Sequence, residues 1–235
     1  MYMQLTWDSD FFGIKIGRIN DTNLNFKVLK EILKCAKKDN FKLIYWSSDN
    51  LLNSVEIESL NGCLVDTKTT LEVSCHGDVV EIPLGAHVIQ QYDAKFAAEI
   101  EELSIQSGEF SRYAVDEHIP RDKFEMLYRI WIRKSIQGEL AENVLIAVDN
   151  RCLAGLVTLG NENGKGSIGL LAVKKEFRGR KYGEALVKSA QKWFVDKKYS
   201  IGQVITQGGN IASINLYKKC GYSIIREEFF YHFWI

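Results

Sequence analysis

One stretch constrains the fold of this chain more than any other: residues 170–186, Leu-Leu-Ala-Val-Lys-Lys-Glu-Phe-Arg-Gly-Arg-Lys-Tyr-Gly-Glu-Ala-Leu. An apolar run is followed by a basic segment with two glycines and then by an apolar-periodic segment, which predicts a strand, a turn and a helix. The first amides of a helix have no intrahelical acceptors and bind anions readily. Gly179 and Gly183 let the backbone approach a ligand closely. Three cations add positive charge at the same turn: Arg178, Arg180 and Lys181. This arrangement predicts a pyrophosphate-binding turn, with a solvated surface turn as the alternative.

A second helix carries two polar residues on one face. Asn210 and Tyr217 lie seven residues apart, which is two helical turns. A tyrosine phenol has an ordinary pKa of about 10, so it is protonated at neutral pH and can donate a proton to a departing thiolate. Asn210 can cap the helix and share its amide with a ligand. The alternatives are a core tyrosine with a wet tip and an asparagine that only caps.

The strand that enters the turn ends at Leu171-Ala172-Val173. Its side chains are predicted to lie in the core, whereas backbone amides at a strand edge can bind a carbonyl or amide group. A phosphate-binding turn, such a strand end and a phenol together indicate group transfer from a carrier with a pyrophosphate handle.

The composition narrows the function classes. The 235 residues carry 30 Lys and Arg against 30 Asp and Glu, so no global basic field attracts nucleic acid or anionic lipid. The N-terminus lacks a signal-peptide pattern and no stretch is long and apolar enough to span a bilayer, so we expect a cytoplasmic enzyme. The five cysteines are expected to be reduced thiols. No metal site is predicted from the four scattered histidines: His76, His87, His118 and His232.

Pro83-Leu84-Gly85 separates the predicted elements into two groups, because proline is scarce in this chain. We expect an N-terminal α/β domain over residues 1–82 and a second domain over residues 83–235. The patterns predict helices at 26–38, 55–60, 94–105, 123–136, 183–196 and 211–219. They predict strands at 42–46, 64–73, 88–91, 143–148, 153–159, 167–173, 203–206, 222–226 and 229–234, with turns at 149–150 and 160–164.

A faint repeat links the two predicted domains. Leu60-Asn61-Gly62 and Lys219-Cys220-Gly221 both follow a predicted helix and precede a predicted strand. The first domain is interpreted either as a shortened copy of the second or as unrelated to it, with the repeat arising by chance.

The motif residues resemble the acetyl-CoA site of the GNAT superfamily of N-acetyltransferases. That pattern is Gln/Arg-x-x-Gly-x-Gly/Ala after a strand, then Asn, then a Leu-Tyr-x-Lys-x-Gly-Phe-like segment. Lys181 replaces the usual central glycine, and Tyr222 stands where Phe is usual. The resemblance implies an α/β (α+β) GNAT fold: a mixed, mostly antiparallel sheet flanked by helices, with a smaller N-terminal α/β unit. It also implies acetyl-CoA as co-substrate, without a metal. The implied cofactor-binding residues are Leu171, Ala172, Val173, Arg178, Gly179, Arg180, Lys181, Tyr182, Gly183 and Asn210.

Other segments resemble a narrower group, the TDP-fucosamine acetyltransferase branch. These segments are Trp7–Gly13, Ser111–Tyr113, Leu127–Ile132 and Thr206–Asn210. The branch acetylates the amino group of a dTDP-linked dideoxy amino sugar for surface polysaccharide, and it carries an additional N-terminal α/β unit. The resemblance implies a nucleotide-sugar substrate, a homodimer, a general-acid role for Tyr217 and contact of Asn210 with CoA.

The mechanism that the resemblance implies is direct transfer. The free amine attacks the thioester carbonyl, and backbone N–H groups of residues 171–173 stabilise the oxyanion by about 3 kcal/mol per donor. Tyr217 protonates the leaving thiolate. A base or a water chain must take the proton of the amine. The sequence does not identify this base, and Glu109, Asp116 and His118 are expected to be solvated loop residues.

A nucleotide sugar brings a diphosphate that requires further cations. Arg112 is the first candidate, together with Tyr113 in the same segment, and Arg121 is the second. For Arg121 an exposed arginine or an interface ion pair is the favoured interpretation. We interpret Trp7, Phe11 and Phe12 as core packing between the two domains, rather than as a platform for a sugar ring.

Two other functions stay open. The first keeps the chemistry but uses another amine: a protein N-terminus, a polyamine or an antibiotic. A polyamine enzyme is expected to line its acceptor cleft with acids, and a nucleotide-sugar enzyme with arginine and aromatic residues. The second is a CoA-binding module without catalysis, which has no need of the Tyr217 phenol.

Overall fold

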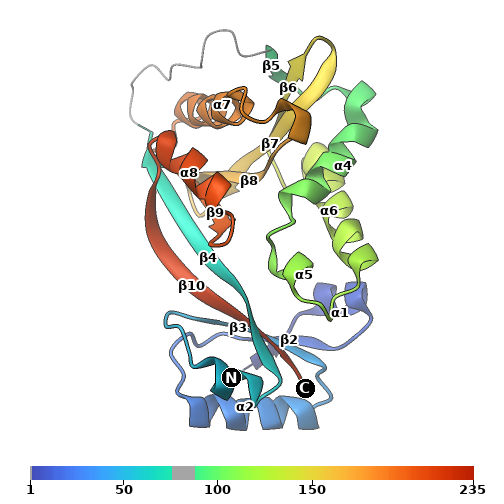
Figure 1. Ribbon diagram of the computed structural model, residues 1–235, viewed down its shortest axis with the longest axis vertical. Helices are drawn as coiled ribbons and strands as arrows, with labels where there is room; N and C mark the ends of the chain where they lie inside the picture. The colour runs from blue at the N-terminus through green and yellow to red at the C-terminus, as the bar shows by residue number, and fades with distance from the viewer. Residues whose placement is uncertain (1, 76–87) are drawn as a thin grey trace. The chain divides into compact units, whose positions relative to one another are not determined.

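The computed structural model describes residues 2–75 and 88–235, which form two compact units (Figure 1). The first unit contains Met1–Thr69, Gln207–Gly209 and Arg226–Ile235. The second contains Thr70–Thr206 and Asn210–Ile225. The predicted boundary at Pro83-Leu84-Gly85 lies outside the described residues, as do His76 and His87. The division into residues 1–82 and 83–235 therefore stays a prediction.

The first unit is a small α/β layer with the strand order β1-β2-β3-β10-β4. Strands β2 and β3 are parallel and are connected by helix α2, while β1 pairs with β2 and β10 pairs with β3 in antiparallel fashion. Its elements are β1 (Tyr2–Gln4), α1 (Thr6–Phe12), β2 (Ile16–Ile19), α2 (Phe26–Lys38), β3 (Leu43–Ser48), α3 (Ser54–Glu58) and parts of β4 (Gly62–Ser74) and β10 (Ser223–Trp234).

Helix α2 shows how local signals fix this unit. Asn25 caps the helix, because its Oδ1 accepts the N–H of Val28 at 3.0 Å. Apolar residues recur every three or four positions, so Leu29, Leu33 and Ala36 are buried on one face. The helix predicted at 26–38 is confirmed.

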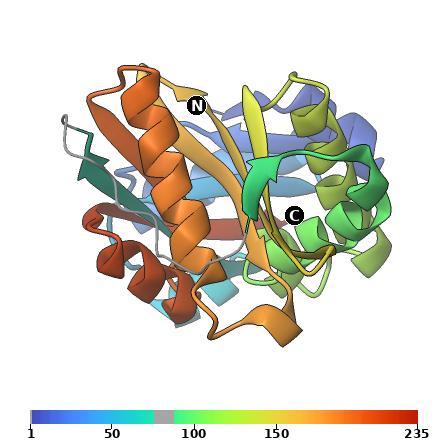
Figure 2. The same cartoon turned by 90° about the horizontal axis from the view of Figure 1, so that it is seen from above.

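The second unit contains the larger sheet, in the order β4-β9-β8-β7-β6-β5. Helix α7 packs on one face against β7 and β8, and α4 packs on the other face with α6 against it (Figure 2). In this unit β5–β6, β6–β7 and β7–β8 pair in antiparallel fashion, and β8–β9 is a parallel pair. The prediction of a mixed, mostly antiparallel sheet flanked by helices is therefore confirmed. Further elements are β5 (Val88–Gln91), η1 (Ala94–Phe96), α4 (Ala97–Ser107), α5 (Arg112–Val115), α6 (Arg121–Ile136), β6 (Asn143–Asp149), β7 (Cys152–Glu162), β8 (Lys165–Val173), η2 (Lys175–Phe177), α7 (Tyr182–Asp196), β9 (Ile201–Gln207) and α8 (Ile211–Lys219).

Strands β8 and β9 are tightly packed at one end. Gly166 and Gly202 face each other across the two strands, and the fully buried ring of Phe194 from α7 lies against both. A Cβ atom would lie 2.3 Å from this ring at Gly166 and 2.7 Å from it at Gly202. The two glycines therefore make room for the Phe194 side chain, which packs α7 against the sheet.

The same two strands diverge at their other end. Among the described residues, their pairing covers Gly166–Ile168 against Gly202–Val204. Strand β8 continues to Val173 and is paired there with β7 on its opposite edge. One edge of β8 after Ile168 is therefore not used by β9.

Two predicted hairpin turns are wrong in position. The first is formed by Asn150 and Arg151 rather than by residues 149–150, because Asp149 still pairs with Cys152. The second is shorter than residues 160–164 and is formed by Asn163 and Gly164. Both central residues of each turn have positive φ, as a type I′ hairpin requires.

The C-terminal segment forms one long strand, β10, where the sequence predicts two strands at 222–226 and 229–234. Glu227 and Glu228 lie between the two predicted strands. In the structure the carboxylate of Glu228 is buried and lies 3.3 Å from both Lys68 Nζ and Arg226 Nη2. These ion pairs let a charged residue stay within the strand.

Several short elements are not predicted from the sequence, namely β1, α1, β2 and α5. They are too short to show a full helical or strand period. The faint repeat joins α3 to β4 and α8 to β10, and a shortened copy stays a prediction. Within residues 2–75 and 88–235, no helix combines the length and apolar character that a bilayer crossing requires.

Candidate active site

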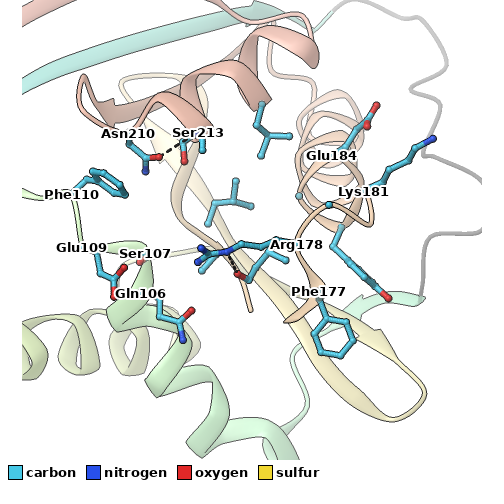
Figure 3. Close-up of a pocket in the computed structure, with 18 of the residues that line it drawn as sticks. Gln106, Ser107, Glu109, Phe110, Phe177, Arg178, Lys181, Glu184, Asn210 and Ser213 are labelled. Carbon is cyan, nitrogen blue, oxygen red and sulfur yellow. Dashed lines mark hydrogen bonds between the residues drawn. The ribbon is translucent and has the colours of Figure 1, made fainter. Parts of the chain in front are cut away.

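A cavity of about 510 Å³ lies in the second unit at the diverging end of β8 (Figure 3). Four segments line it: the end of α4 with its following loop, the last residues of β8, the turn into α7 and the start of α8. All four segments belong to the second unit. The structure therefore brings the predicted phosphate-binding turn and the predicted Asn210 helix together at one cavity.

The strand wall of the cavity consists of Leu171, Ala172 and Val173. The N–H of Lys174 donates to the carbonyl oxygen of Ala154 on β7 at 2.9 Å. Alternate residues of an antiparallel strand direct their backbone groups to opposite edges. Ala172 therefore also faces β7, whereas the N–H groups of Leu171 and Val173 face the edge from which β9 has diverged.

Arg178 lies against this strand end. Its Nε donates to the carbonyl oxygen of Val173 at 3.1 Å (Figure 3). The N–H and C=O of one strand residue share an edge, so this bond independently places the backbone of Val173 on the cavity side. It also holds a positive charge on the cavity wall.

The turn into α7 has two residues in the left-handed region, Gly179 with φ +77° and Lys181 with φ +67°. Lys181 stands immediately before the first helical residue, and no side chain among the described residues caps α7. Gly183 and Glu184, in the first turn of this helix, line the cavity. The positive end of the helix dipole therefore lies beside the cavity and favours an anion there.

Helix α8 begins with an internal cap. Oδ1 of Asn210 accepts the N–H of Ser213 at 3.1 Å, which confirms the predicted N-cap. Asn210 lines the cavity, and so do four helix residues that are not predicted as site residues from the sequence: Ala212, Ser213, Leu216 and Lys219. Ala212, Leu216 and Lys219 are four and three residues apart and therefore lie on one face of α8. This spacing is the sequence signal from which they could be assigned to the same surface as one another. Gly183 lets α7 pass close to this face, since a Cβ there would lie 3.0 Å from Leu216 Cδ2.

Tyr217 belongs to the buried face of α8, with Ile214. Its side chain is 4% exposed, its ring centroid lies 5.7 Å from that of Tyr222, and it is not among the described residues that line the cavity. Burial, and then the nearby Cys220, raises the pKa of Tyr217 well above its ordinary value. Tyr217 therefore keeps its proton at neutral pH. Its neighbour in the sequence, Leu216, lines the cavity.

Two other groups near the cavity are held protonated. Burial raises the pKa of the Cys220 thiol to about 11, so it is not an ionised nucleophile. Burial, and then a hydrogen bond with Asp149, raises the pKa of Tyr182 to about 12. Arg180, a predicted cofactor residue, does not line the described cavity; its Nη1 lies 3.8 Å from Asp149 and its guanidinium lies over the Phe177 ring.

The three predicted substrate residues do not line the described cavity. Arg112 donates through Nη2 to the hydroxyl of Tyr113, and its Cζ lies 4.6 Å from the centroid of that ring. Arg121 is exposed, and its Nε lies 3.0 Å from Oε1 of Glu125. The favoured interpretation of Arg121 as an exposed arginine agrees with this position.

The wall opposite α7 comes from the end of α4 and the loop after it (Figure 3). Its residues are Gln106, Ser107, Glu109 and Phe110. The sequence predicts a helix over residues 94–105, but no local pattern shows that the end of this helix meets β8. Phe177 and Glu184 also line the cavity without having been predicted.

Two expectations away from the cavity have different outcomes. Trp7 is 49% exposed and stacks on Phe11 with ring centroids 5.0 Å apart, so its predicted core packing is wrong. In the described part of the chain, no three His, Cys, Asp or Glu side chains gather in a way that could hold a metal ion. The absence of a metal stays a prediction.

Comparisons with known proteins identify relatives of this chain. The Acetyltransferase (GNAT) family matches residues 100–222, more than half of the chain, and this range contains every residue that lines the cavity. The spore coat polysaccharide biosynthesis protein SpsD of Bacillus subtilis (strain 168) is 26% identical over 133 residues, which are 57% of this chain and 46% of that protein. The chain thus covers less than half the length of this relative.

Several solved structures share the fold. A conserved protein of unknown function from Staphylococcus epidermidis has a TM-score of 0.67 at 13% identity, covering 94% of this chain and 84% of that chain. A GCN5-related N-acetyltransferase from Sphaerobacter thermophilus has a TM-score of 0.61 at 12% identity, covering 98% and 75%. The PaiA N-acetyltransferase of Thermoplasma acidophilum, in complex with coenzyme A, has a TM-score of 0.50 at 17% identity, covering 63% and 98%. Since the family match spans more than half of the chain, including the diverging strands, the turn and helices α7 and α8, this chain belongs to the Acetyltransferase (GNAT) family.

Proposed function

We propose that this protein transfers the acetyl group of acetyl-CoA to the amino group of a dTDP-linked dideoxy amino sugar. The observation that carries the proposal is that the uncapped start of α7 and the unpaired edge of β8 meet at one cavity. Family membership supports acetyl-CoA as the donor. The relative named for spore coat polysaccharide biosynthesis, together with the branch resemblance, supports a sugar acceptor.

The start of α7 suits the pyrophosphate of CoA. Gly183 and Glu184 offer first-turn N–H groups, and Lys181 adds positive charge. Gly179 has no side chain that could block the approach of a phosphate to the backbone. A hydrogen bond to a charged group contributes about 1.5–3 kcal/mol, so two or three of them give substantial affinity. Bound acetyl-CoA supplies the activated acetyl group.

The unpaired edge of β8 suits the thioester. The N–H groups of Leu171 and Val173 stabilise the negative charge that develops on the carbonyl oxygen during transfer, by about 3 kcal/mol per donor. Because the N–H of Ala172 is directed to β7, it is not available to the thioester oxygen. Leu171 and Val173 are therefore the two donors that remain of the three predicted. Tyr217 donates its proton to the departing sulfur, and its raised pKa keeps that proton in place until then.

The acceptor side and the assembly rest on the branch resemblance. Arg112, held against the ring of Tyr113, binds the diphosphate of the nucleotide sugar, and Arg121 is the second candidate. We also infer a homodimer and a cytoplasmic location. Light scattering of the purified chain at several concentrations tests the homodimer, and a constant monomer mass would contradict it.

Thiol release from acetyl-CoA tests the function. The purified protein is incubated with dTDP-3-amino and dTDP-4-amino dideoxyhexoses, spermidine, a peptide with a free N-terminus and an aminoglycoside. We expect release with one of the two sugar nucleotides and an N-acetyl product by mass spectrometry. Thiol release with one of the other amines alone would show that this amine, and not a sugar nucleotide, is the acceptor. Binding of acetyl-CoA without thiol release in the presence of any of these amines would support the alternative of a CoA-binding module without catalysis.

Tyr217→Phe tests the proton donor. We expect kcat to fall about 100-fold while the Kd for acetyl-CoA stays the same, because only the transferred proton is lost. Tyr222→Phe is the matched control, since it removes a hydroxyl from the neighbouring buried ring. Equal kcat values for Tyr217→Phe and the wild type would remove the assigned role.

A further inference from the structure

The cavity is lined by two carboxylates with different surroundings. Glu184, at the start of α7, lies 2.6 Å from Nζ of Lys219. Glu109 lies on the opposite wall, and within residues 2–75 and 88–235 no cation pairs with it (Figure 3). The charge of Glu109 is therefore available to a ligand, while that of Glu184 is already neutralised.

A tight turn holds Glu109 in this position. The N–H of Ser111 donates to the carbonyl oxygen of Gly108 at 2.8 Å, which closes a four-residue turn with Glu109 and Phe110 as its central residues. Gly108 lies directly against Tyr128, because a Cβ there would be 2.2 Å from the ring. The base of the turn is thus buried, and its two central side chains line the cavity.

The two walls of the cavity favour opposite charges. The start of α7, with Lys181 and Arg178, attracts an anion, whereas Glu109 attracts a cation. A primary amine with a pKa of about 10 is mostly protonated at neutral pH. Such an ammonium group must lose a proton before its nitrogen can attack a thioester. The wall that attracts a cation is therefore the place for the acceptor, and it carries a group that can take the proton.

We propose that Glu109 accepts the proton of the acceptor's ammonium group, and that the Phe110 ring packs against the apolar face of the same acceptor. The proposal rests on the proposed acetyl transfer. The N–H bond breaks and its proton moves to the Glu109 carboxylate. The freed electron pair forms the C–N bond, and the C–S bond breaks as the sulfur leaves with its electrons and takes a proton from Tyr217. The nitrogen then loses a second proton to water, and Tyr217 regains its proton from water. Glu109 then releases its proton to water.

Three variants test this assignment. Glu109→Gln removes the base but keeps the shape of the side chain, and Glu109→Asp keeps a base on a shorter arm. Glu117→Gln makes the same charge change at an exposed residue outside the cavity lining. We measure kcat/KM for a dTDP-4-amino-4,6-dideoxyhexose between about pH 6 and 9, or for whichever amine of the panel the wild type acetylates, with the acetyl-CoA Kd of each variant.

The pH dependence distinguishes a base from a structural residue. Glu109→Gln must rely on amine that is already neutral, so its kcat/KM should be about 100-fold low near pH 6.5 and recover toward the wild type as pH rises. Glu109→Asp should recover part of the loss. Glu117→Gln should match the wild type, and acetyl-CoA affinity should stay within about twofold throughout.

Three results would overturn the assignment. If Glu109→Gln has the wild-type pH profile, the proposed acetyl transfer still stands, but Glu109 is not its base. A loss that is equal at every pH and accompanied by weaker acetyl-CoA binding shows a structural role instead. A wild-type protein that acetylates no amine removes the proposed function together with the base.

Discussion

Helices α7 and α8, which both line the cavity with their N-terminal turns, begin in different ways. At α8 the side chain of Asn210 accepts the N–H of Ser213, so part of the first turn is satisfied by the chain itself. At α7 the preceding residue is Lys181, in the left-handed region, and no side chain in the described part of the chain caps the helix. A side-chain cap satisfies one of the free first-turn N–H groups within the chain, whereas an uncapped start keeps that hydrogen-bonding capacity for a bound anion. This difference supports phosphate binding at α7 and structural capping at α8.

The largest expected effect of breaking this difference is at α7. Gly183→Asp puts a carboxylate among the N–H groups that we propose bind the phosphates, next to Leu216. Affinity for CoA should fall by about 100-fold, because each lost hydrogen bond to a charged group costs about 1.5–3 kcal/mol and the new charge repels the ligand. Titration calorimetry with CoA measures this change.

Ile211→Asp is the matched control at the start of α8. Ile211 is exposed and does not line the cavity, so the same charge at a helix start should change CoA affinity by about twofold or less. If both variants lost affinity equally, the two helix starts would not differ in the way the capping indicates.

Local signals account for the parts of the site that were predicted. The helix at 211–219 and its Asn210 cap agree with the structure because both depend on residues within one or two turns. The turn into α7 was predicted for the same reason, since Gly179 and Gly183 mark backbone requirements that are visible in the sequence. Lys181 stands where the resembling pattern has a glycine, and it adopts the left-handed region that glycine adopts most readily.

The remaining parts depend on contacts between distant segments. Helical spacing correctly relates Asn210 to Tyr217, but it does not show which face of α8 meets the cavity. Tyr217 is buried next to the cavity-lining Leu216, and its role as proton donor stays a prediction. The wall with Glu109 exists only because α4 packs on the sheet near the end of β8. The unpaired edge of β8 depends on where β9 stops pairing, which no residue of β8 determines alone.

Asn210→Ala tests the capped helix with a smaller expected effect. The free energy of unfolding should fall by about 1 kcal/mol, because the first turn of α8 loses its side-chain acceptor. Urea denaturation measures this change, and Asn210→Ser, which keeps a capping oxygen, should retain most of the stability. An unchanged stability in Asn210→Ala would show that the cap contributes little, and a common loss of acetyl-CoA affinity in both variants would point to a ligand contact as well.

The smallest expected effect concerns the uncapped helix. Lys181 holds a φ of +67°, which glycine adopts more easily than other residues, although glycine also gives the unfolded chain more freedom. Lys181→Gly should therefore be about 0.5–1 kcal/mol more stable to urea than Lys181→Ala, which keeps the unfavourable backbone. Both variants lose the same charge, so both should bind acetyl-CoA about threefold more weakly than the wild type. Equal stability of the two variants would contradict the left-handed conformation, whereas unchanged affinity in both would mean that the strained lysine does not serve the phosphates.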